Sequence, residues 1–148
     1  MKLKIKALSP KIGRDIPLPY YATDGAAAMD LHACVDEAVV IAPGERVLIP
    51  TGLAVAVPTG HVGIVAVRSS MGIKKGIMLA NGIGVIDSDY RGPLGVGLVN
   101  ATSAPYTVCP GDRVAQLMIL PVVRPQPELV DELDETERGQ GGFGSTGR

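Results

Sequence analysis

Short aliphatic and β-branched runs, with glycine or proline at most of the breaks between them, constrain the fold of this chain more than any other feature. The runs are 39–41, 46–49, 53–57, 62–67, 77–80, 84–86, 94–99, 106–108 and 114–120. A spacing near ten residues between turn signals is typical of antiparallel sandwiches and barrels. Because no segment keeps an apolar stripe at the helical period, we expect an all-β domain with at most a short helical turn at 70–74.

Charge and apolar run length limit the functional classes. The first eight residues alternate charged and apolar side chains, which predicts a strand and not the apolar block of a signal peptide. No apolar run approaches the roughly 20 residues of a membrane span, so we expect a cytoplasmic protein without membrane contact. The net charge of −1 and the lack of a basic, aromatic-interleaved stripe argue against direct nucleic-acid binding. Cys34 and Cys109 are expected to be buried free thiols.

The composition changes after Leu120, which predicts an extended arm. Three prolines follow, then an acidic stretch over 128–137 without a single base, then a glycine-rich end. Such a segment adds little to a core. We therefore expect a β domain over 1–120 and an arm over 121–148.

The glycine-rich end can be interpreted in two ways. It could be a disordered solubilising tail. Alternatively, Arg138 supplies a fixed cation, Gly144 and its glycine neighbours offer bare backbone N–H groups, and Ser145 and Thr146 add hydroxyls. Phe143, the only phenylalanine, lies among these glycines, where it could cover a flat base. This pattern favours a site for phosphates beside an aromatic lid.

Polar residues at the ends of two apolar strands are candidate phosphate ligands. Arg68 closes one strand and could present a planar fork to a phosphate, with Ser69 and Ser70 as further donors. An ordinary exposed strand end would explain the same residues. Gln116 lies within an apolar strand, and its amide needs a partner, either in the core or on a ligand.

Two aspartates are candidates for metal binding or catalysis. Asp30 and His32 should share the strand face opposite Leu31, which predicts either a solvent-facing aspartate or a carboxylate that holds the waters of a magnesium ion. Asp87 follows Val85 and Ile86 at the start of a predicted hairpin turn over 87–92. Turn chemistry alone could explain Asp87, but in a partly dry setting it could act as a general base toward water.

Taken in order, five segments resemble the five motifs of the trimeric dUTP pyrophosphatase (dUTPase) family. The segments are Ala-Met-Asp-Leu at 28–31, Arg-Ser-Ser-Met-Gly at 68–72, the stretch 81–92, Gly-Asp-Arg-Val-Ala-Gln at 111–116, and Arg-Gly-Gln-Gly-Gly-Phe-Gly-Ser-Thr at 138–146. The resemblance spans nearly the whole chain, and the third and fifth motifs are the most specific. Ala28 stands where the family often has glycine, and His32 where arginine is common.

The resemblance implies a fold, an assembly and a reaction. The fold would be a jelly-roll-like β barrel, assembled as a homotrimer with active sites at subunit boundaries and an arm that crosses to a neighbour. The reaction would be Mg²⁺-assisted, in-line attack of water on the α-phosphorus of dUTP, giving dUMP and pyrophosphate. Such an enzyme limits uracil in DNA and supplies dUMP for thymidylate synthesis.

The resemblance also implies roles for individual residues. Asp87 would activate the water, and Asp30 would hold the waters of the magnesium ion. The phosphates and the attacking water would be bound by Arg68, Ser69, Ser70 and Gln116, with Arg138, Gly144, Ser145 and Thr146 contributed by the tail. The nucleoside would be recognised by Asn81, the backbone of Val85, Ile86 and Asp87, the ring of Tyr90, a backbone contact at Gly95, and Phe143 stacked on the base.

Two other functions compete with this one. A dCTP deaminase of the same fold would need an acid–base group beside the base, and no glutamate lies in or next to 81–92. A non-catalytic β module would bind partners through its arm and would have no need for these polar motifs.

Overall fold

The computed structural model describes residues 1–142, and this part of the chain is built almost entirely of short strands. Their bounds are β1 (Lys4–Ala7), β2 (Met29–His32), β3 (Val39–Ile41), β4 (Arg46–Pro50), β5 (Leu53–Ala56), β6 (His61–Ala66), β7 (Ile77–Leu79), β8 (Gly84–Ile86), β9 (Gly95–Asn100), β10 (Tyr106–Val108) and β11 (Arg113–Pro121). A single π-helical turn, η1 (Ser70–Lys74), interrupts them. The predicted all-β class is confirmed.

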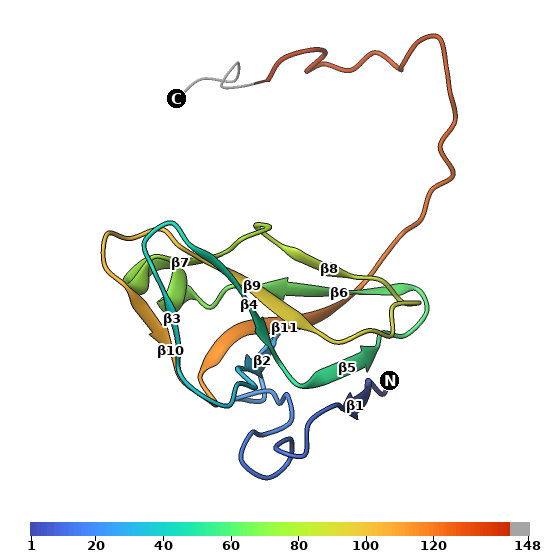
Figure 1. The fold of residues 1–148 in the computed structure, drawn as a ribbon. Helices are drawn as coiled ribbons and strands as arrows, with labels where there is room; N and C mark the ends of the chain where they lie inside the picture. The colour runs from blue at the N-terminus through green and yellow to red at the C-terminus, as the bar shows by residue number, and fades with distance from the viewer. Residues whose placement is uncertain (143–148) are drawn as a thin grey trace.

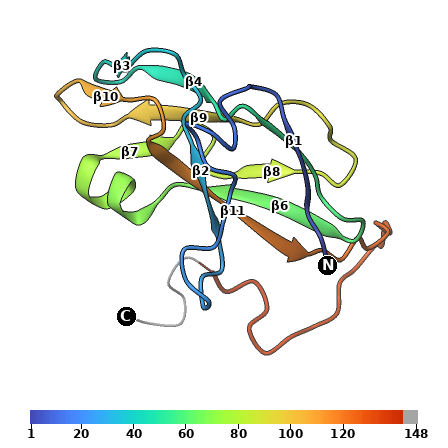
Figure 2. The same ribbon diagram turned by 90° about the horizontal axis from the view of Figure 1, so that it is seen from below.

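The strands form two sheets and two antiparallel ribbons (Figures 1 and 2). One sheet has the order β2-β11-β6-β8 and the other β4-β9-β7, while β1 pairs with β5 and β10 with β3. Every pairing between these strands is antiparallel. Neighbours in space are mostly distant in sequence, as in a jelly roll.

The core lies between the two sheets and is filled by aliphatic side chains. Along β9, Val96 and Leu98 are buried while the residues between them are more exposed, the alternation of a strand with one face in the core. On the opposite sheet, Leu31 and Leu117 are fully buried. At about 25 cal/mol per Å² of apolar surface removed from water, this burial is the main stabilising contribution.

The segment predicted as a β-hairpin around 87–92 is not one, and this prediction was wrong. β8 pairs with β6, whereas β9 pairs with β4 and β7. The loop from Asp87 to Pro93 therefore crosses from one sheet to the other. Glycine and aspartate at 87–92 indicated a turn correctly, but turn chemistry does not determine whether the flanking strands pair.

Two further features concern the thiols and membrane contact. Cys109 is exposed and Cys34 is partly exposed, so the prediction of two buried thiols was wrong. Among residues 1–142, no helix is long and apolar enough to cross a bilayer.

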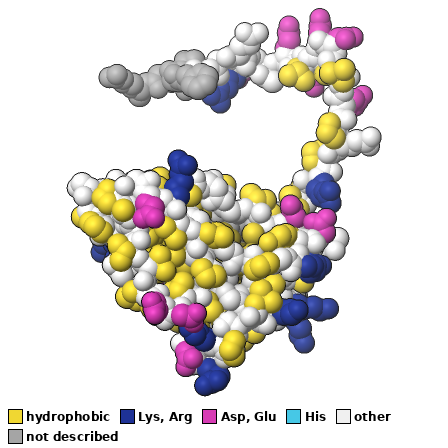
Figure 3. Space-filling model, viewed as in Figure 1, with side chains coloured by type: hydrophobic (Ala, Val, Ile, Leu, Met, Phe, Trp, Pro, Cys, Tyr) yellow, Lys and Arg dark blue, Asp and Glu magenta, His cyan; other side chains and the backbone are white. Residues whose placement is uncertain are grey.

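The chain leaves the barrel at the end of β11. The backbone N–H of Val122 donates to the carbonyl oxygen of Gly60 over 2.9 Å, and residues 122–142 contain no helix or strand. In Figure 3 the acidic side chains of this arm stand well apart from the barrel. The arm therefore extends away from the β domain after it leaves β11 (Figure 1).

Candidate active site

An open groove lies where β8 and the start of β9 separate into different sheets. Its volume is about 310 Å³, and its lining residues are Leu48, Val85, Ile86, Asp87, Tyr90, Pro93, Leu94 and Gly95. β8 is the last strand of its sheet, so its side away from β6 has no strand partner in the described structure. The groove therefore exposes backbone donors and acceptors that a flat polar ring could bind.

A smaller hollow of about 120 Å³ continues the groove toward Asn81. It shares Val85, Ile86 and Gly95 with the first groove. Asn81, which lies in a turn before β8, is exposed. The predicted nucleoside-binding residues of this region, 81, 85–87, 90 and 95, are thus brought together within one chain.

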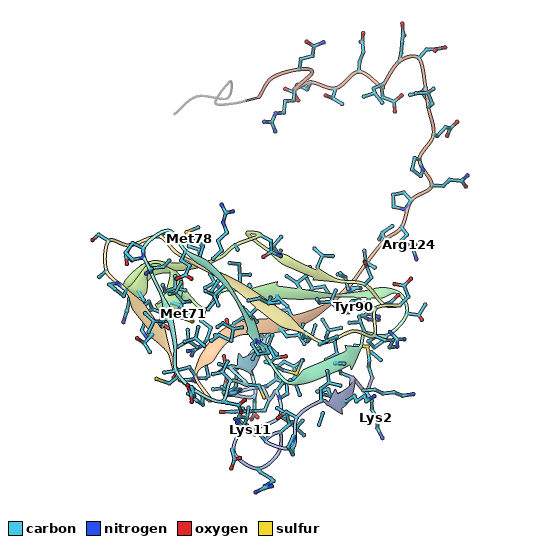
Figure 4. All side chains as sticks on the ribbon, in the orientation of Figure 1. Lys2, Lys11, Met71, Met78, Tyr90 and Arg124 are labelled. Carbon is cyan, nitrogen blue, oxygen red and sulfur yellow. The ribbon has the colours of Figure 1, made fainter. Side chains whose placement is uncertain are left out.

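Tyr90 forms a wall of the groove, and Gly92 allows it to do so. The Tyr90 hydroxyl donates to the carbonyl oxygen of Pro93 over 3.0 Å. A Cβ atom added at Gly92 would crowd the hydroxyl and ring of Tyr90, so a larger residue would force this side chain to shift. Because its hydroxyl is already bonded, Tyr90 offers its ring face to a ligand. Figure 4 labels Tyr90 at the end of the barrel where the arm begins near Arg124.

A second polar cluster lies on the outer face of the other end of the sheet. Asp30 on β2 lies directly opposite Gln116 on β11, and Gln116 Nε2 is 3.4 Å from Asp30 Oδ1. Arg68 Nε is 3.1 Å from the same oxygen, and Arg113 Nη1 donates to Oδ2 over 3.2 Å. We call Asp30, Arg68, Arg113 and Gln116 the Asp30 cluster.

The expectation of a solvent-facing Asp30 was wrong, because only 4% of this residue is exposed. Alternation placed its side chain correctly on the face opposite Leu31. It could not show that two arginines and a glutamine cover that face. Gln116, expected to be buried, is instead only partly buried.

The Nε atom of Arg68 lies near Asp30 but is not hydrogen-bonded to it. Its Nε lies within ion-pair distance of Asp30, but the N–H is not directed at the oxygen, so this buried atom has no hydrogen-bond partner among the described residues. Ser69 is exposed and makes no side-chain capping hydrogen bond to η1, and Ser70 is partly buried. A buried, unsatisfied donor atom on a cationic side chain is a suitable contact for an anionic ligand.

His32 is a buried neighbour of the Asp30 cluster. Its ring stacks on Tyr20, with centroids 6.5 Å apart, and its Nδ1 has no hydrogen-bond partner in the described part of the chain. Burial lowers the pKa of His32 below 6.5, although the charge of Asp30 opposes that shift. The imidazole is therefore held mainly neutral near pH 7.

The groove and the Asp30 cluster are far apart in one chain. Asp30 and Ala66 lie in one row across β2, β11 and β6, whereas Ile86 of β8 lies opposite Gly63. With strands about 4.8 Å apart and a rise of about 3.3 Å per residue, Asp87 lies roughly 20 Å from Asp30. One nucleotide cannot place its reacting phosphate beside both carboxylates of the same chain.

Asp87 lies at the mouth of the groove and is exposed in the single chain, not partly dry as expected. It also borders a second groove on the other side of the loop, with Ser88, Asp89 and Arg124. The arm therefore begins beside the Asp87 loop of its own chain.

The tail is described only in part. Arg138 is exposed, and its Nε donates to the carbonyl oxygen of Gly141 over 2.8 Å. The predicted ligands Phe143, Gly144, Ser145 and Thr146 lie outside the described residues.

One member of the Asp30 cluster, Arg113, was missed by the sequence analysis. Its proximity to Asp30 depends on the register of β2 against β11, which the sequence does not reveal. The available signal was the motif Gly-Asp-Arg-Val-Ala-Gln itself, in which Arg113 precedes Gln116 by three residues.

Known proteins resemble this chain over its whole length. The family model described as dUTPase matches residues 14–147. A deoxyuridine 5'-triphosphate nucleotidohydrolase of Enterobacter sp. (strain 638) is 49% identical over 148 residues, covering 99% of this chain and 97% of that protein. The protein of the same name from Escherichia coli O9:H4 (strain HS) is 45% identical, with 99% and 98% covered.

Solved structures show the same likeness. The dUTPase of Staphylococcus bacteriophage 80alpha with dUPNHPP superposes with a TM-score of 0.87 at 28% identity, and the match covers 99% of both chains. A mutant dUTPase from phage phi11 of S. aureus, described as coordinating a structural Mg(II) ion, superposes with a TM-score of 0.79 at 25% identity and covers 91% of this chain and all of that one.

Proposed function

The chain belongs to the dUTPase family and hydrolyses dUTP, and from this premise we propose how its own residues bind the nucleotide and direct water to the α-phosphorus. The products are dUMP and pyrophosphate. The observation that carries the proposal is the groove between β8 and β9, where a free strand edge meets Asp87 and the ring of Tyr90.

Uracil binds in this groove like an additional strand partner. The free edge of β8 at Val85 and Ile86 offers backbone N–H and C=O groups, and Asn81 closes the inner end with a side-chain amide. Fixed donors and acceptors reject cytosine, whose polar edge has a different pattern. A backbone surface in van der Waals contact with the ring leaves no space for the methyl group of thymine.

The sugar packs on Tyr90. The hydroxyl of this tyrosine is bonded to Pro93, so the ring cannot turn aside easily. A ring held against the deoxyribose excludes a 2′-hydroxyl by steric contact. Discrimination against UTP therefore rests on Tyr90 and on Gly92, which allows the ring its place.

The phosphates bind at the Asp30 cluster of a neighbouring subunit. The buried Nε of Arg68 lacks a hydrogen-bond partner among the described residues and fits a phosphate oxygen. Ser69 and Ser70 are accessible beside it, and Gln116 lies one strand away. Arg138 and the tail motif from 143 to 146 close over the phosphates and the base.

The residues fit a magnesium ion that arrives on the phosphates. Within residues 1–142, no group of three or more His, Cys, Asp or Glu side chains converges, so these residues form no direct metal cage. Mg²⁺ characteristically keeps several waters and binds through few carboxylates plus substrate phosphates. When bound, it would neutralise charge that develops on the phosphates. In the nucleotide complex, Asp30 would be the carboxylate that accepts hydrogen bonds from its waters.

Asp87 acts as the general base. It lies at the open end of the base-binding groove, so a nucleotide seated there directs its α-phosphate toward the carboxylate. Asp87 accepts a proton from the water that attacks the phosphorus, and pyrophosphate leaves on the opposite side.

A homotrimer with shared active sites would bring the groove of one subunit next to the Asp30 cluster of another. The separation of about 20 Å between Asp30 and Asp87 along the sheet prevents one chain from completing a site. The exposed strands carry large apolar side chains outside the groove, including Val40 at 58%, Met78 at 49% and Leu120 at 45% exposure, which a partner chain would cover. We also propose a cytoplasmic location, where deoxynucleotides are drawn on for DNA synthesis.

Pyrophosphate release from each common deoxynucleoside triphosphate, with and without Mg²⁺, tests this function. We expect release from dUTP alone, and only with the metal. Release of ammonia from dCTP without pyrophosphate from dUTP would instead identify a deaminase. A protein that neither cleaves dUTP nor gains thermal stability from it would be a non-catalytic module.

A further inference from the structure

The carboxylate of Asp30 is fully engaged by the chain itself. Oδ1 lies 3.1 Å from Arg68 Nε and 3.4 Å from Gln116 Nε2, and Oδ2 accepts a hydrogen bond from Arg113 at 3.2 Å. Only 4% of Asp30 is exposed. No coordinated water could reach this carboxylate unless one of its cationic partners moved.

The charges around Asp30 favour an anion over a free cation. One carboxylate faces two guanidinium groups, so the Asp30 cluster carries a net positive charge. A divalent cation alone is repelled by this arrangement, whereas a triphosphate is attracted.

Arg113 is the partner best placed to move. Its side chain is 46% exposed, against 22% for Arg68. A register shift in β11 between Arg113 and Ala115 puts Arg113 opposite His32, from which it reaches sideways to Asp30. Bulges of this kind redirect side chains next to functional sites. A phosphate could take the exposed guanidinium without unpacking the sheet.

We propose that Arg113 is a positioning residue that masks Asp30 in the free protein and releases it when its guanidinium turns to the triphosphate. Asp30 then becomes available to the waters of the metal only after the nucleotide has bound. Metal and nucleotide binding are therefore coupled through one exchange of partners, and the free protein disfavours metal alone. The proposal rests on the proposed function, since it takes the triphosphate as the anion.

The test measures binding, apart from catalysis. Mn²⁺ affinity of the nucleotide-free protein is determined by electron paramagnetic resonance for the wild type and for Arg113→Gln. Removing one unit charge about 8 Å from a divalent ion that Asp30 holds through a water should raise this affinity about fivefold, the scale of such an interaction in water. The non-hydrolysable analogue dUPNHPP is then titrated by calorimetry with and without Mg²⁺. The factor by which Mg²⁺ strengthens analogue binding should fall by about the same fivefold, because coupling is reciprocal.

Two variants serve as controls. Arg113→Lys keeps the charge and should leave Mn²⁺ affinity within about twofold of the wild type. Arg46→Gln removes an exposed charge from β4 in the other sheet and should change neither quantity. Melting temperatures of all variants identify any loss of folding, and Arg113→Lys keeps the test decisive if Arg113→Gln unfolds.

The outcomes separate the inference from the function it rests on. A wild-type protein that does not bind dUPNHPP contradicts the proposed function. A wild type that binds it, with Arg113→Gln showing unchanged Mn²⁺ affinity and unchanged coupling, overturns the masking role. A change in melting temperature alone would make Arg113 a structural ion-pair partner. A lysine variant with the metal affinity of Arg113→Gln would likewise contradict an electrostatic mask.

Discussion

Asn100 at the end of β9 is fully buried, and its side-chain amide donates to the carbonyl oxygen of Ile41 at the end of β3 over 2.9 Å. The same amide donates to Ala104, and its oxygen accepts from the backbone N–H and the hydroxyl of Thr102. One side chain thereby joins β9, β3 and the loop before β10.

Replacing Asn100 with alanine should destabilise the protein strongly. The substitution removes the four hydrogen bonds of this buried amide, among them the donor to the Ile41 carbonyl in the core, and a buried group left unsatisfied costs about 1–3 kcal/mol. We expect a loss of on the order of 3 kcal/mol in the free energy of unfolding, measured by urea denaturation. A loss under about 0.5 kcal/mol would mean that water replaces the amide.

Asn81→Ala provides the matched asparagine control. Asn81 is exposed, so its removal should change the free energy of unfolding by no more than about 0.5 kcal/mol. If Asn81 reads the base, kcat/KM for dUTP should nevertheless fall by about a hundredfold. Normal kinetics in this variant would remove Asn81 from the base-binding residues.

Asp87→Asn should bind the nucleotide but not turn it over. The amide keeps the shape of the carboxylate and cannot accept the proton of the attacking water. We expect kcat to fall by at least about 10²-fold, with dUPNHPP affinity within a few fold of the wild type. Asp89→Asn, in the same loop, should retain nearly full turnover. Comparable losses in both variants would indicate a general effect of loop charge.

Deleting residues 138–148 should remove activity and leave the β domain folded. The described hydrogen bonds of Arg138 and Gly139 lie within the arm, so the barrel loses none of its own. Pyrophosphate release and the melting temperature measure the two effects. Removing only residues 147–148, which leaves the motif through Thr146, should be harmless. A fully active long truncation would refute the lid role of the tail.

His32 predicts how stability responds to acid in metal-free buffer. Its pKa in the folded protein is lowered from 6.5 by burial, so the unfolded chain binds more protons below that pH. The free energy of unfolding should therefore decline as the pH falls from 6.5 through the folded-state pKa, and His32 should contribute no slope well above pH 6.5. Urea denaturation in EDTA should show a weaker acid decline for His32→Gln. Parallel curves for the two proteins would contradict this assignment.

The strands were predictable because alternation and turn residues are local properties. β9, for example, can be recognised by the alternation of its large apolar side chains and by the glycine and proline before it. The separation of β8 from β9 was not predictable, since the partner of each strand lies elsewhere in the chain. Local sequence defined the loop at Asp87, and long-range pairing determined that it opens a groove.

In the candidate site, too, some features were predictable from the sequence and others depend on long-range strand pairing. Motif resemblance selected Asp30, Arg68 and Gln116, and these three lie together in the folded chain. The burial of Asp30 and its pairing with Arg113 depend on register and on a bulge, which no local pattern reveals. Sequence also could not show that Asp87 and Asp30 of one chain lie too far apart to act together.

The free edge of β8 has a consequence for how the enzyme can change. A ligand that forms hydrogen bonds with main-chain atoms is recognised by groups that a point mutation does not remove. Substitution of the side chain at Val85 or Ile86 therefore leaves the pattern of backbone donors and acceptors unchanged. Broadening the accepted base would require moving one sheet relative to the other, which many core residues resist together. The fold itself therefore determines which base is accepted. Directed evolution toward another pyrimidine should proceed through insertions or deletions in the loop between β8 and β9.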